Sequence, residues 1–153
     1  MLHGITSDLS NWEALLVGYP GQPNPFNPST REAAKQLLSR VFYNQKTFVT
    51  YAGVEQFFNT RMSVGDGYTI KRLTESRMRR QDLLDDRLPA LKRPTLLIQG
   101  RQDKLTPAAL SERLKQEITG SELLMLDNCG HAPPIKKPNE FNAAAVRFLS
   151  ERR

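Results

Sequence analysis

In the middle of the chain, apolar side chains recur every three or four positions, which is the spacing of one face of an α-helix. The first such stripe consists of Ala33, Ala34, Leu37, Leu38, Val41 and Phe42. Ser29 and Glu32 stand just before it and fit a capping box, so we expect Ser29 to cap this helix. Two further helices are expected over roughly Val54–Met62 and Tyr68–Leu84, with a break at Gly65–Gly67 between them.

From about residue 89 the pattern changes to short, mostly apolar runs that alternate with helical segments. Thr95–Ile98 lies between Pro94 and Gly100, and Leu123–Leu126 repeats the same kind of run. Such runs are typical of strands buried in a parallel sheet. Strand, helix, strand and helix in this order predict an α/β fold, a parallel sheet flanked by helices.

Two helices are expected around these strands. Thr106 is predicted to cap the first, with Pro107 in its opening turn. Pro138 begins the second. The apolar side of that last helix is expected to include Phe141, Ala144, Val146, Phe148 and Leu149.

The amino-terminal part is rich in turn-forming residues. Tyr19–Pro25 contains three prolines and is incompatible with a regular helix. Composition and pattern together divide the chain at about residues 20 and 88. We therefore expect three segments, 1–20, the helical 21–88, and 89–153.

Composition narrows the class of protein. With 153 residues, 39% hydrophobic and 25% charged, the chain is long enough for one globular core and is unlike a disordered chain. Its apolar runs, such as Ala14–Val17, are too short to span a membrane. One cysteine excludes an intramolecular disulfide and a cysteine-based zinc cluster, and no secretion signal is visible near Met1, so a cytoplasmic location is expected.

The net charge of +6 raises the question of an anionic partner. The densest basic stretch holds Lys71, Arg72, Arg77, Arg79 and Arg80. Leucines and acidic residues are interspersed with them, as on the solvated face of an amphipathic helix. Stacking aromatics and a nucleic-acid-binding motif are both missing, so nucleic-acid binding is not predicted.

Two candidate chemical groups follow the predicted strands. Asp103 comes soon after Gly100, and His131 follows the second strand. The carboxyl ends of parallel strands form the usual ligand-binding edge of such a sheet. A carboxylate and an imidazole there suit a base and the group that orients it. Taken singly, Asp103 is also an ordinary turn residue and His131 an ordinary loop residue.

The surrounding sequence resembles the α/β-hydrolase superfamily. Leu91–Pro107 is similar to the segment that carries the family's acid, and Leu126–Pro133, with its Gly130-His131 pair, is similar to the histidine loop. The resemblance covers about the last 65 residues and implies that Asp103 is the triad acid and His131 the base. It implies that residues 21–88 form a lid and that Glu13–Gly18 is the strand leading into it.

A weaker resemblance lies at the amino terminus. His3, Gly4 and Ile5, followed by Trp12, are similar to the family's oxyanion loop, in which a backbone N–H stabilises the developing negative charge. The match implies that the N–H of Ile5 supplies this contact. The alternative is that His-Gly is simply a common dipeptide.

The sequence also departs from the family. A Gly-x-Ser-x-Gly nucleophile elbow is absent, and Arg61–Gly65, the nearest approach, lies in the predicted lid. Cys129 is interpreted as a packing residue rather than a nucleophile. The resemblance therefore implies a truncated or internally deleted hydrolase. Ala132 and Lys136 replace an aromatic and an acidic residue typical of carbon–carbon bond hydrolases, which favours an esterase-like ancestry.

Two functions follow from these observations. In the first, the chain takes part in ester hydrolysis by a Ser-His-Asp mechanism on a small-molecule, ester-like substrate, without cofactor or metal. In the second, it is a non-catalytic remnant that binds through an exposed sheet edge, as a homodimer or with a complementary hydrolase fragment. Neither function requires a membrane.

Overall fold

The computed structural model describes residues 26–78 and 85–152. Two compact units divide these residues. The first holds the described residues up to Ser39 together with Gln45–Asp86, and the second holds Arg40–Asn44 and the described residues from Arg87 onward. The predicted segment 1–20, including the expected strand Glu13–Gly18, lies outside the described residues.

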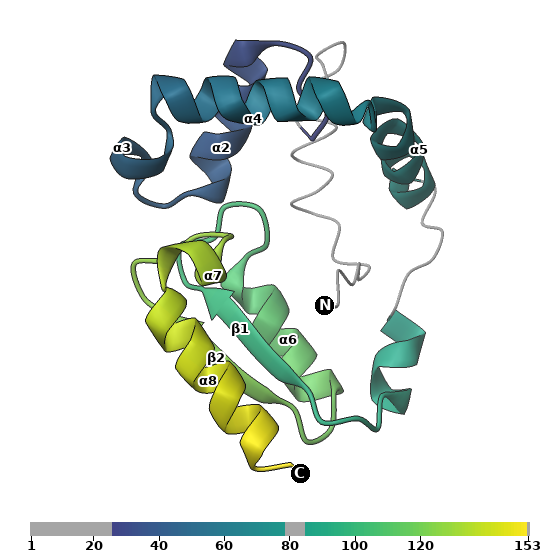
Figure 1. Ribbon diagram of the computed structural model, residues 1–153. Helices are drawn as coiled ribbons and strands as arrows, with labels where there is room; N and C mark the ends of the chain where they lie inside the picture. The colour runs from purple at the N-terminus through teal and green to yellow at the C-terminus, as the bar shows by residue number, and fades with distance from the viewer. Residues whose placement is uncertain (1–25, 79–84, 153) are drawn as a thin grey trace. The chain divides into compact units, whose positions relative to one another are not determined.

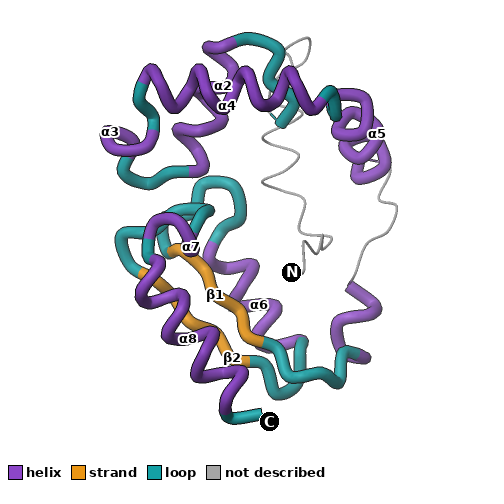
Figure 2. Tube along the Cα trace, in the orientation of Figure 1, coloured by secondary structure: helices purple, strands orange, loops and turns teal. Residues whose placement is uncertain are grey.

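The helices predicted in the middle of the chain are confirmed with shifted ends (Figure 2). They are α2 (Arg31–Val41), α4 (Tyr51–Val64) and α5 (Gly67–Met78). The short helix α3 (Gln45–Phe48), between α2 and α4, was not predicted. The end of the third predicted helix, residues 79–84, lies outside the described residues. Gly65 ends α4 with a φ of 67°, a left-handed conformation that glycine adopts without steric cost, so the expected break is present.

The capping box predicted at Ser29 is wrong. Thr30 caps α2 instead, because its Oγ1 accepts the N–H of Ala33 at 3.1 Å and its carbonyl accepts that of Ala34 at 3.0 Å. Glu32 is then the second residue of the helix, one position too early to close a capping box. Ser29 and Thr30 are adjacent hydroxyl residues, and either could begin the helix. The spacing of the apolar stripe does not distinguish the two starting points, which differ by one residue.

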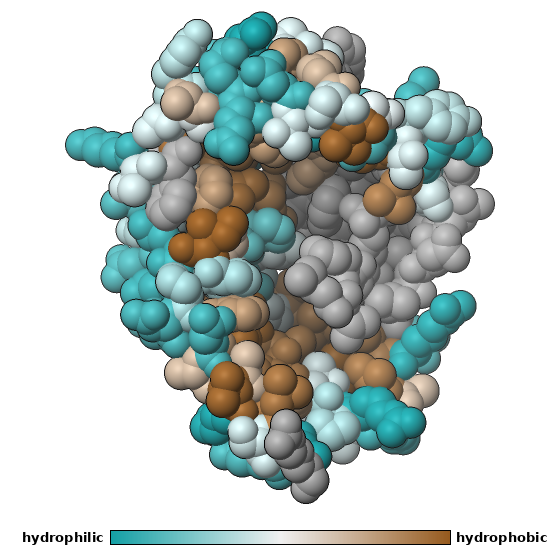
Figure 3. Space-filling model, in the orientation of Figure 1, coloured by the Kyte–Doolittle hydropathy of each residue, from teal (hydrophilic) through white to brown (hydrophobic). Residues whose placement is uncertain are grey.

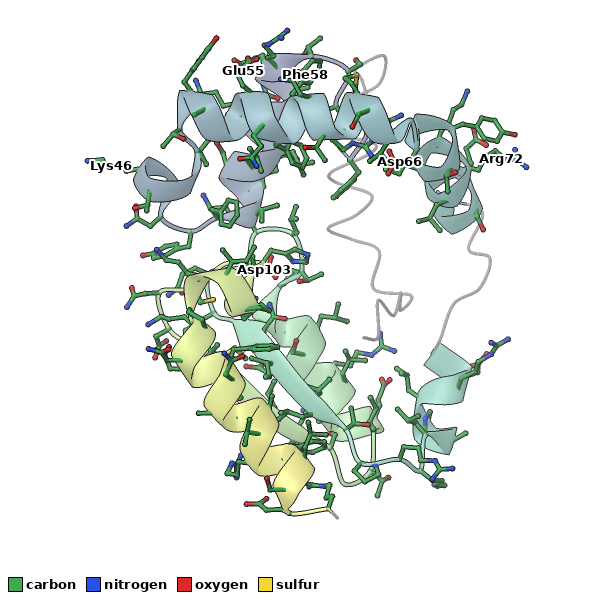
Figure 4. All side chains as sticks on the ribbon, viewed as in Figure 1. Lys46, Glu55, Phe58, Asp66, Arg72 and Asp103 are labelled. Atoms are coloured by element: carbon green, nitrogen blue, oxygen red, sulfur yellow. The ribbon has the colours of Figure 1, made fainter. Side chains whose placement is uncertain are left out.

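The apolar stripe of α2 contributes buried residues to the first unit. Ala34 and Leu38 are buried, as is Val54 of α4. Arg31 links the two helices, since its Nε lies 2.5 Å from Glu55 Oε1 and its guanidinium lies over the Phe58 ring. Figure 4 labels Glu55 and Phe58 on α4. Two residues of the predicted stripe are therefore buried in this unit, whereas Val41 and Phe42 at its end belong to the second unit.

The second unit contains a parallel pair of strands, β1 (Leu96–Gly100) and β2 (Glu122–Leu126). The short 3₁₀-helix η1 (Asp85–Ala90) precedes β1, with its first two residues in the first unit. Between the strands runs α6 (Ala108–Glu117), and β2 is followed by α7 (Pro133–Lys136) and α8 (Pro138–Ser150). Figure 1 shows α8 in front of the strands and α6 behind them. The predicted α/β arrangement is confirmed.

The core of the second unit is gathered around these strands. Its buried apolar residues are Leu88, Leu105, Ile118, Leu126, Cys129 and Ala144. Among the described residues, each strand has the other as its only neighbour. The sheet is therefore incomplete by the standard of parallel sheets, which are usually larger and covered on both faces.

The predicted inner side of α8 is partly wrong. Its less exposed positions are Phe141, Ala144, Ala145 and Phe148, which follow the spacing of one helical face. Val146 and Leu149 are 63% and 67% exposed, and hydrophobic surface is visible over the carboxyl-terminal half of α8 in Figure 3. The prediction assigned more apolar residues to the buried side of α8 than one face of a helix can hold.

The loops after β1 and β2 approach each other closely. Arg101 and Gln102 donate their N–H groups to the carbonyls of Leu126 and Cys129, both at 2.9 Å. A side chain at Gly100 would place its Cβ 2.5 Å from the Cys129 carbonyl oxygen and closer still to that of Gly130. Glycine at position 100 is thus required for the loops to meet.

We expect Gly100→Ala to lower the free energy of unfolding by about 3 kcal/mol, because the added methyl group meets backbone that cannot move aside. Gly120→Ala is the control. Its φ of 75° strains alanine but its surroundings are open, so a cost of about 1 kcal/mol is expected. Urea denaturation followed by circular dichroism measures both, and equal losses would contradict the close approach.

Candidate active site

The parallel register brings Asp103 and His131 to the same edge of the sheet. Gly100, the last residue of β1, pairs with Leu126, the last residue of β2, so both loops leave at the same level. Asp103 lies in the first loop and His131 in the second. The placement expected from strand order is observed.

The two side chains are in direct contact. His131 Nδ1 lies 2.9 Å from Asp103 Oδ2. The Asp103 side chain is only 3% exposed, whereas that of His131 is 35% exposed. Asp103 is labelled in Figure 4, where it lies beyond the carboxyl end of β1. A buried carboxylate thus holds one nitrogen of a partly accessible imidazole.

Asp103 accepts hydrogen bonds on both oxygens. Oδ1 accepts the N–H groups of Leu105 at 2.7 Å and Thr106 at 3.0 Å. Oδ2 accepts the Thr106 hydroxyl at 2.6 Å and the Gln99 amide at 3.1 Å, in addition to His131. Burial is the largest single influence and raises the pKa of Asp103. The hydrogen bonds from His131 and Thr106, with the charge of His131, outweigh it, so the pKa lies below its ordinary value.

Thr106 does not cap α6, contrary to the prediction. The residue at the cap position is Pro107, and no side chain caps the helix. The Thr106 hydroxyl is directed to the acid instead and also lies 3.3 Å from His131 Nδ1. It donates its one hydrogen to the carboxylate, which leaves its lone pairs facing the ring nitrogen.

The histidine loop is held through its backbone. Cys129 donates its N–H to Gln102 Oε1 at 3.0 Å, and His131 donates its N–H to the Val41 carbonyl at 2.9 Å. Gly130 packs so closely on the backbone of Val41 and Tyr43 that a Cβ would lie 2.7 and 2.9 Å from their atoms. Residues 40–44, which belong to the same unit, therefore help to fix the position of His131.

Cys129 is fully buried beside this site. Its thiol lies 3.7 Å from the Gly130 carbonyl, and burial raises its pKa. A thiol held in its neutral form is a poor nucleophile. These observations support the interpretation of Cys129 as a packing residue.

Three polar residues around the acid were not predicted as part of the site. Thr106 was assigned to a helix cap, and Gln99 and Ser111 were not singled out. Gln99 and Ser111 are 8% and 7% exposed, and the Ser111 hydroxyl donates to Gln99 Oε1 at 2.8 Å. The available signal was a glutamine inside an apolar strand, which needs polar partners once buried.

The remaining candidates do not join this pair within the described residues. His3, Gly4 and Ile5 lie outside them. Ser63 of the imperfect elbow lies inside α4 and donates to the Thr60 carbonyl at 2.8 Å, which is not a strand-to-helix turn.

Clusters of metal ligands and membrane-spanning helices are both missing from the described part of the chain. It contains no group of three or more His, Cys, Asp or Glu residues arranged as metal ligands. It also contains no helix with the length and apolar character needed to cross a membrane.

Comparison with known families agrees with this geometry. The model of the alpha/beta hydrolase fold matches residues 22–138. The chain belongs to the α/β-hydrolase family. The resemblance inferred from the acid and histidine segments is therefore confirmed, and so is the expected fold class.

Individual relatives within the α/β-hydrolase family share shorter segments. "Putative carbamate hydrolase RutD" from Rhizobium rhizogenes is 39% identical over 69 residues, which are 45% of this chain and 26% of that protein. The pimeloyl-[acyl-carrier protein] methyl ester esterase of Nitrosomonas europaea is 37% identical over 54 residues, 35% of this chain and 21% of that protein. Both are much longer than their matched segments.

A solved structure matches most of the chain. The meta-cleavage product hydrolase CumD from Pseudomonas fluorescens IP01 superimposes with a TM-score of 0.75 at 26% identity. The match covers 85% of this chain and 49% of that one. The chain thus spans about half the length of a complete α/β-hydrolase of this kind.

We expect Asp103→Asn to lower the free energy of unfolding by about 2 kcal/mol at pH 7. The NH₂ group of asparagine would then face hydrogen-bond donors where a carboxylate oxygen now accepts their hydrogens. Since the folded-state pKa of Asp103 is lowered, its ionisation stabilises the fold above the unfolded pKa of about 3.9. That contribution is lost as the pH falls through the folded-state pKa. The difference between the two proteins should therefore shrink below about pH 4.

Asp127→Asn is the matched control for this measurement. Asp127 is 70% exposed in its pair with Arg101, and such pairs contribute little. Urea denaturation at several pH values compares both variants with the natural chain. A cost for Asp103→Asn that does not change with pH would contradict the ionised, donor-bound carboxylate.

Proposed function

We propose that the chain carries the acid and the base of an ester hydrolase that works by a Ser-His-Asp mechanism. Asp103 is the acid and His131 the base. The observation that carries this proposal is the 2.9 Å contact between Asp103 Oδ2 and His131 Nδ1, with the carboxylate buried and the imidazole partly exposed. This is the arrangement that a base and its orienting group require.

The division of roles follows from the two environments. Asp103 accepts a hydrogen from His131 Nδ1, which leaves Nε2 as the nitrogen able to take a proton. When Nε2 is protonated, the adjacent carboxylate stabilises the imidazolium. The donors around Asp103 favour its ionised form, so the proton stays on the imidazole during transfer.

The substrate class is inferred from the relatives and from the loop sequence. One relative is named as a methyl ester esterase and another as a putative carbamate hydrolase. Acyl transfer to water is common to both reactions. Ala132 and Lys136 also favour an ester over a carbon–carbon bond substrate. A small-molecule, ester-like substrate, processed without cofactor or metal, is therefore proposed.

The remaining family roles belong to the same proposal. Residues 21–88 would form the lid and 89–153 the carboxyl-terminal part of the core. His3, Gly4 and Ile5 would form the oxyanion loop and contribute the Ile5 N–H. A nucleophile elbow is absent from the sequence, and loss of the serine costs on the order of a million-fold in a serine protease. By itself the chain would therefore hydrolyse esters very slowly.

The position of the hydrogen on the His131 ring tests this proposal, and the measurement does not require a nucleophile. In the ¹⁵N-labelled chain at pH 9, we expect neutral His131 to carry its hydrogen on Nδ1 and to leave Nε2 free. Asp103→Asn should shift most of the population to the Nε2–H form, because an amide NH₂ then faces Nδ1. Long-range ¹H–¹⁵N correlation spectra distinguish the two tautomers.

Two variants serve as controls in this experiment. Asp127→Asn should leave the tautomer unchanged, since Asp127 is paired with Arg101 on the surface. His3→Gln assigns the signals, because the chain has only two histidines. A natural chain in which His131 carries its hydrogen on Nε2 would overturn the proposed role of Asp103.

One observation favours a second function, a non-catalytic binding module. Within the described residues, β1 and β2 pair only with each other, and Leu96, Leu97 and Ile98 remain partly exposed. An unpaired strand edge readily accepts a strand from another chain. A homodimer, or a complex with a complementary hydrolase fragment, would cover that edge.

If this second function holds, light scattering after size-exclusion chromatography should give twice the 17.4 kDa of the single chain at micromolar concentration. A Val146→Lys/Leu149→Lys variant should remain dimeric, because these exposed residues lie on α8 and not on the sheet edge. A stable monomer would contradict dimerisation, and dissociation of the α8 variant would assign the contact to the helix instead.

A further inference from the structure

A chain of buried polar side chains lies directly behind the acid. Ser111 of α6 donates its hydroxyl to Gln99 Oε1 at 2.8 Å. Gln99 of β1 donates from Nε2 to Asp103 Oδ2 at 3.1 Å and to the Thr106 carbonyl at 2.9 Å. Gln99 and Ser111 are both almost fully buried. The acid is therefore linked through Gln99 to the helix that follows it.

The chemistry of the partners allows one orientation of the Gln99 amide. A carboxylate and a carbonyl only accept hydrogen bonds, so the amide nitrogen must face Asp103 and Thr106. The amide oxygen then faces Ser111, whose hydroxyl must donate. The Gly100 carbonyl, 3.2 Å from the same nitrogen, adds a third acceptor on that side. A flipped amide would set its oxygen against these oxygens.

This orientation constrains the carboxylate as well. Oδ2 of Asp103 accepts hydrogen bonds from Gln99, Thr106 and His131, while Oδ1 accepts them from two backbone N–H groups. A rotation of the carboxyl group about its Cβ–Cγ bond would break several of these bonds together. Oδ2 is thus held in place beside His131 by Gln99 and Thr106.

We propose that Gln99 is a positioning residue that fixes the carboxylate of Asp103 toward His131, with Ser111 holding the Gln99 amide in place. The inference rests on the proposed roles of Asp103 and His131. Gln99 acts through Asp103, and Ser111 acts through Gln99. No hydrogen bond joins Ser111 to Asp103 among the described residues, so any effect of Ser111 on the acid passes through the amide.

The ionisation of Asp103 tests this arrangement in the full chain. Gln99→Met keeps the length of the side chain and removes its donors. We expect the pKa of Asp103, measured from its carboxyl ¹³C shift, to rise by about one unit, because the charged form loses a buried hydrogen bond. Ser111→Ala keeps the Gln99 amide but removes the hydroxyl that holds it. This variant should give a smaller rise in the pKa of Asp103.

Matched controls separate positioning from ordinary packing. Gln102→Met also removes a glutamine that forms a hydrogen bond, since Gln102 Oε1 accepts the N–H of Cys129 in the histidine loop at 3.0 Å. Ser121→Ala removes a buried hydroxyl that donates to the Lys115 carbonyl at 3.3 Å. Both should lower stability somewhat. Ser121→Ala should leave the pKa of Asp103 unchanged, and Gln102→Met should change it less than Gln99→Met does, because Gln102 reaches Asp103 only through the histidine loop.

The outcomes decide the proposal in each case. A folded Gln99→Met chain with an unchanged Asp103 titration would overturn it, as would equal shifts in the control variants. If Gln99→Met does not fold, Ser111→Ala decides by the same criterion, because removal of one hydroxyl is a milder change. Failure of the proposed function is seen separately, as an Nε2–H tautomer of His131 in the natural chain.

Discussion

The close backbone approach at Gly100 is the constraint on which the rest of the site depends. The parallel register only brings the ends of β1 and β2 to the same level. Because Gly100 has no side chain, the histidine loop can lie directly against the end of β1, and the N–H groups of Arg101 and Gln102 reach its carbonyls. That contact sets the distance between the two loops, and Asp103 and His131 meet at 2.9 Å as its consequence. The glycine is therefore part of the site although it contributes no chemistry.

The two members of the pair are held in different ways, and the difference matches their proposed roles. Asp103 is surrounded by donors from β1, from its own loop and from His131, so it is buried, charged and restricted in rotation. His131 is fixed mainly through its backbone N–H to Val41 and through the carboxylate, and its side chain remains 35% exposed. A group that orients another needs rigidity, whereas a base needs access to the group whose proton it takes.

The sequence predicted what depends on local pattern and strand order. The two strands, the helices around them and the meeting of Asp103 with His131 follow from apolar runs and parallel connectivity. Details that depend on one residue of register or on tertiary partners were wrong or missed. Ser29 and Thr30 are both residue types that cap helices, and only the fold selects Thr30. Thr106 suits a helix cap equally well, yet a buried carboxylate beside it is the stronger acceptor. Val146 and Leu149 are apolar but lie off the packed face of α8.

Among the described residues, the groups that hold Asp103 and His131 come from one unit of the chain, from residues 41–43 and 99–131. The geometry of the proposed acid–base pair therefore does not depend on a nucleophile, and the sequence contains no nucleophile elbow. The pair of Asp103 and His131 is stabilised by burial and by hydrogen bonds. These interactions form whether or not a serine lies near Nε2 of His131. A chain that spans about half of a complete relative can thus retain an ordered contact between Asp103 and His131 without the remaining part of the relative's site. Order at the site and catalytic rate are distinct properties of this fold, and only the second requires the nucleophile.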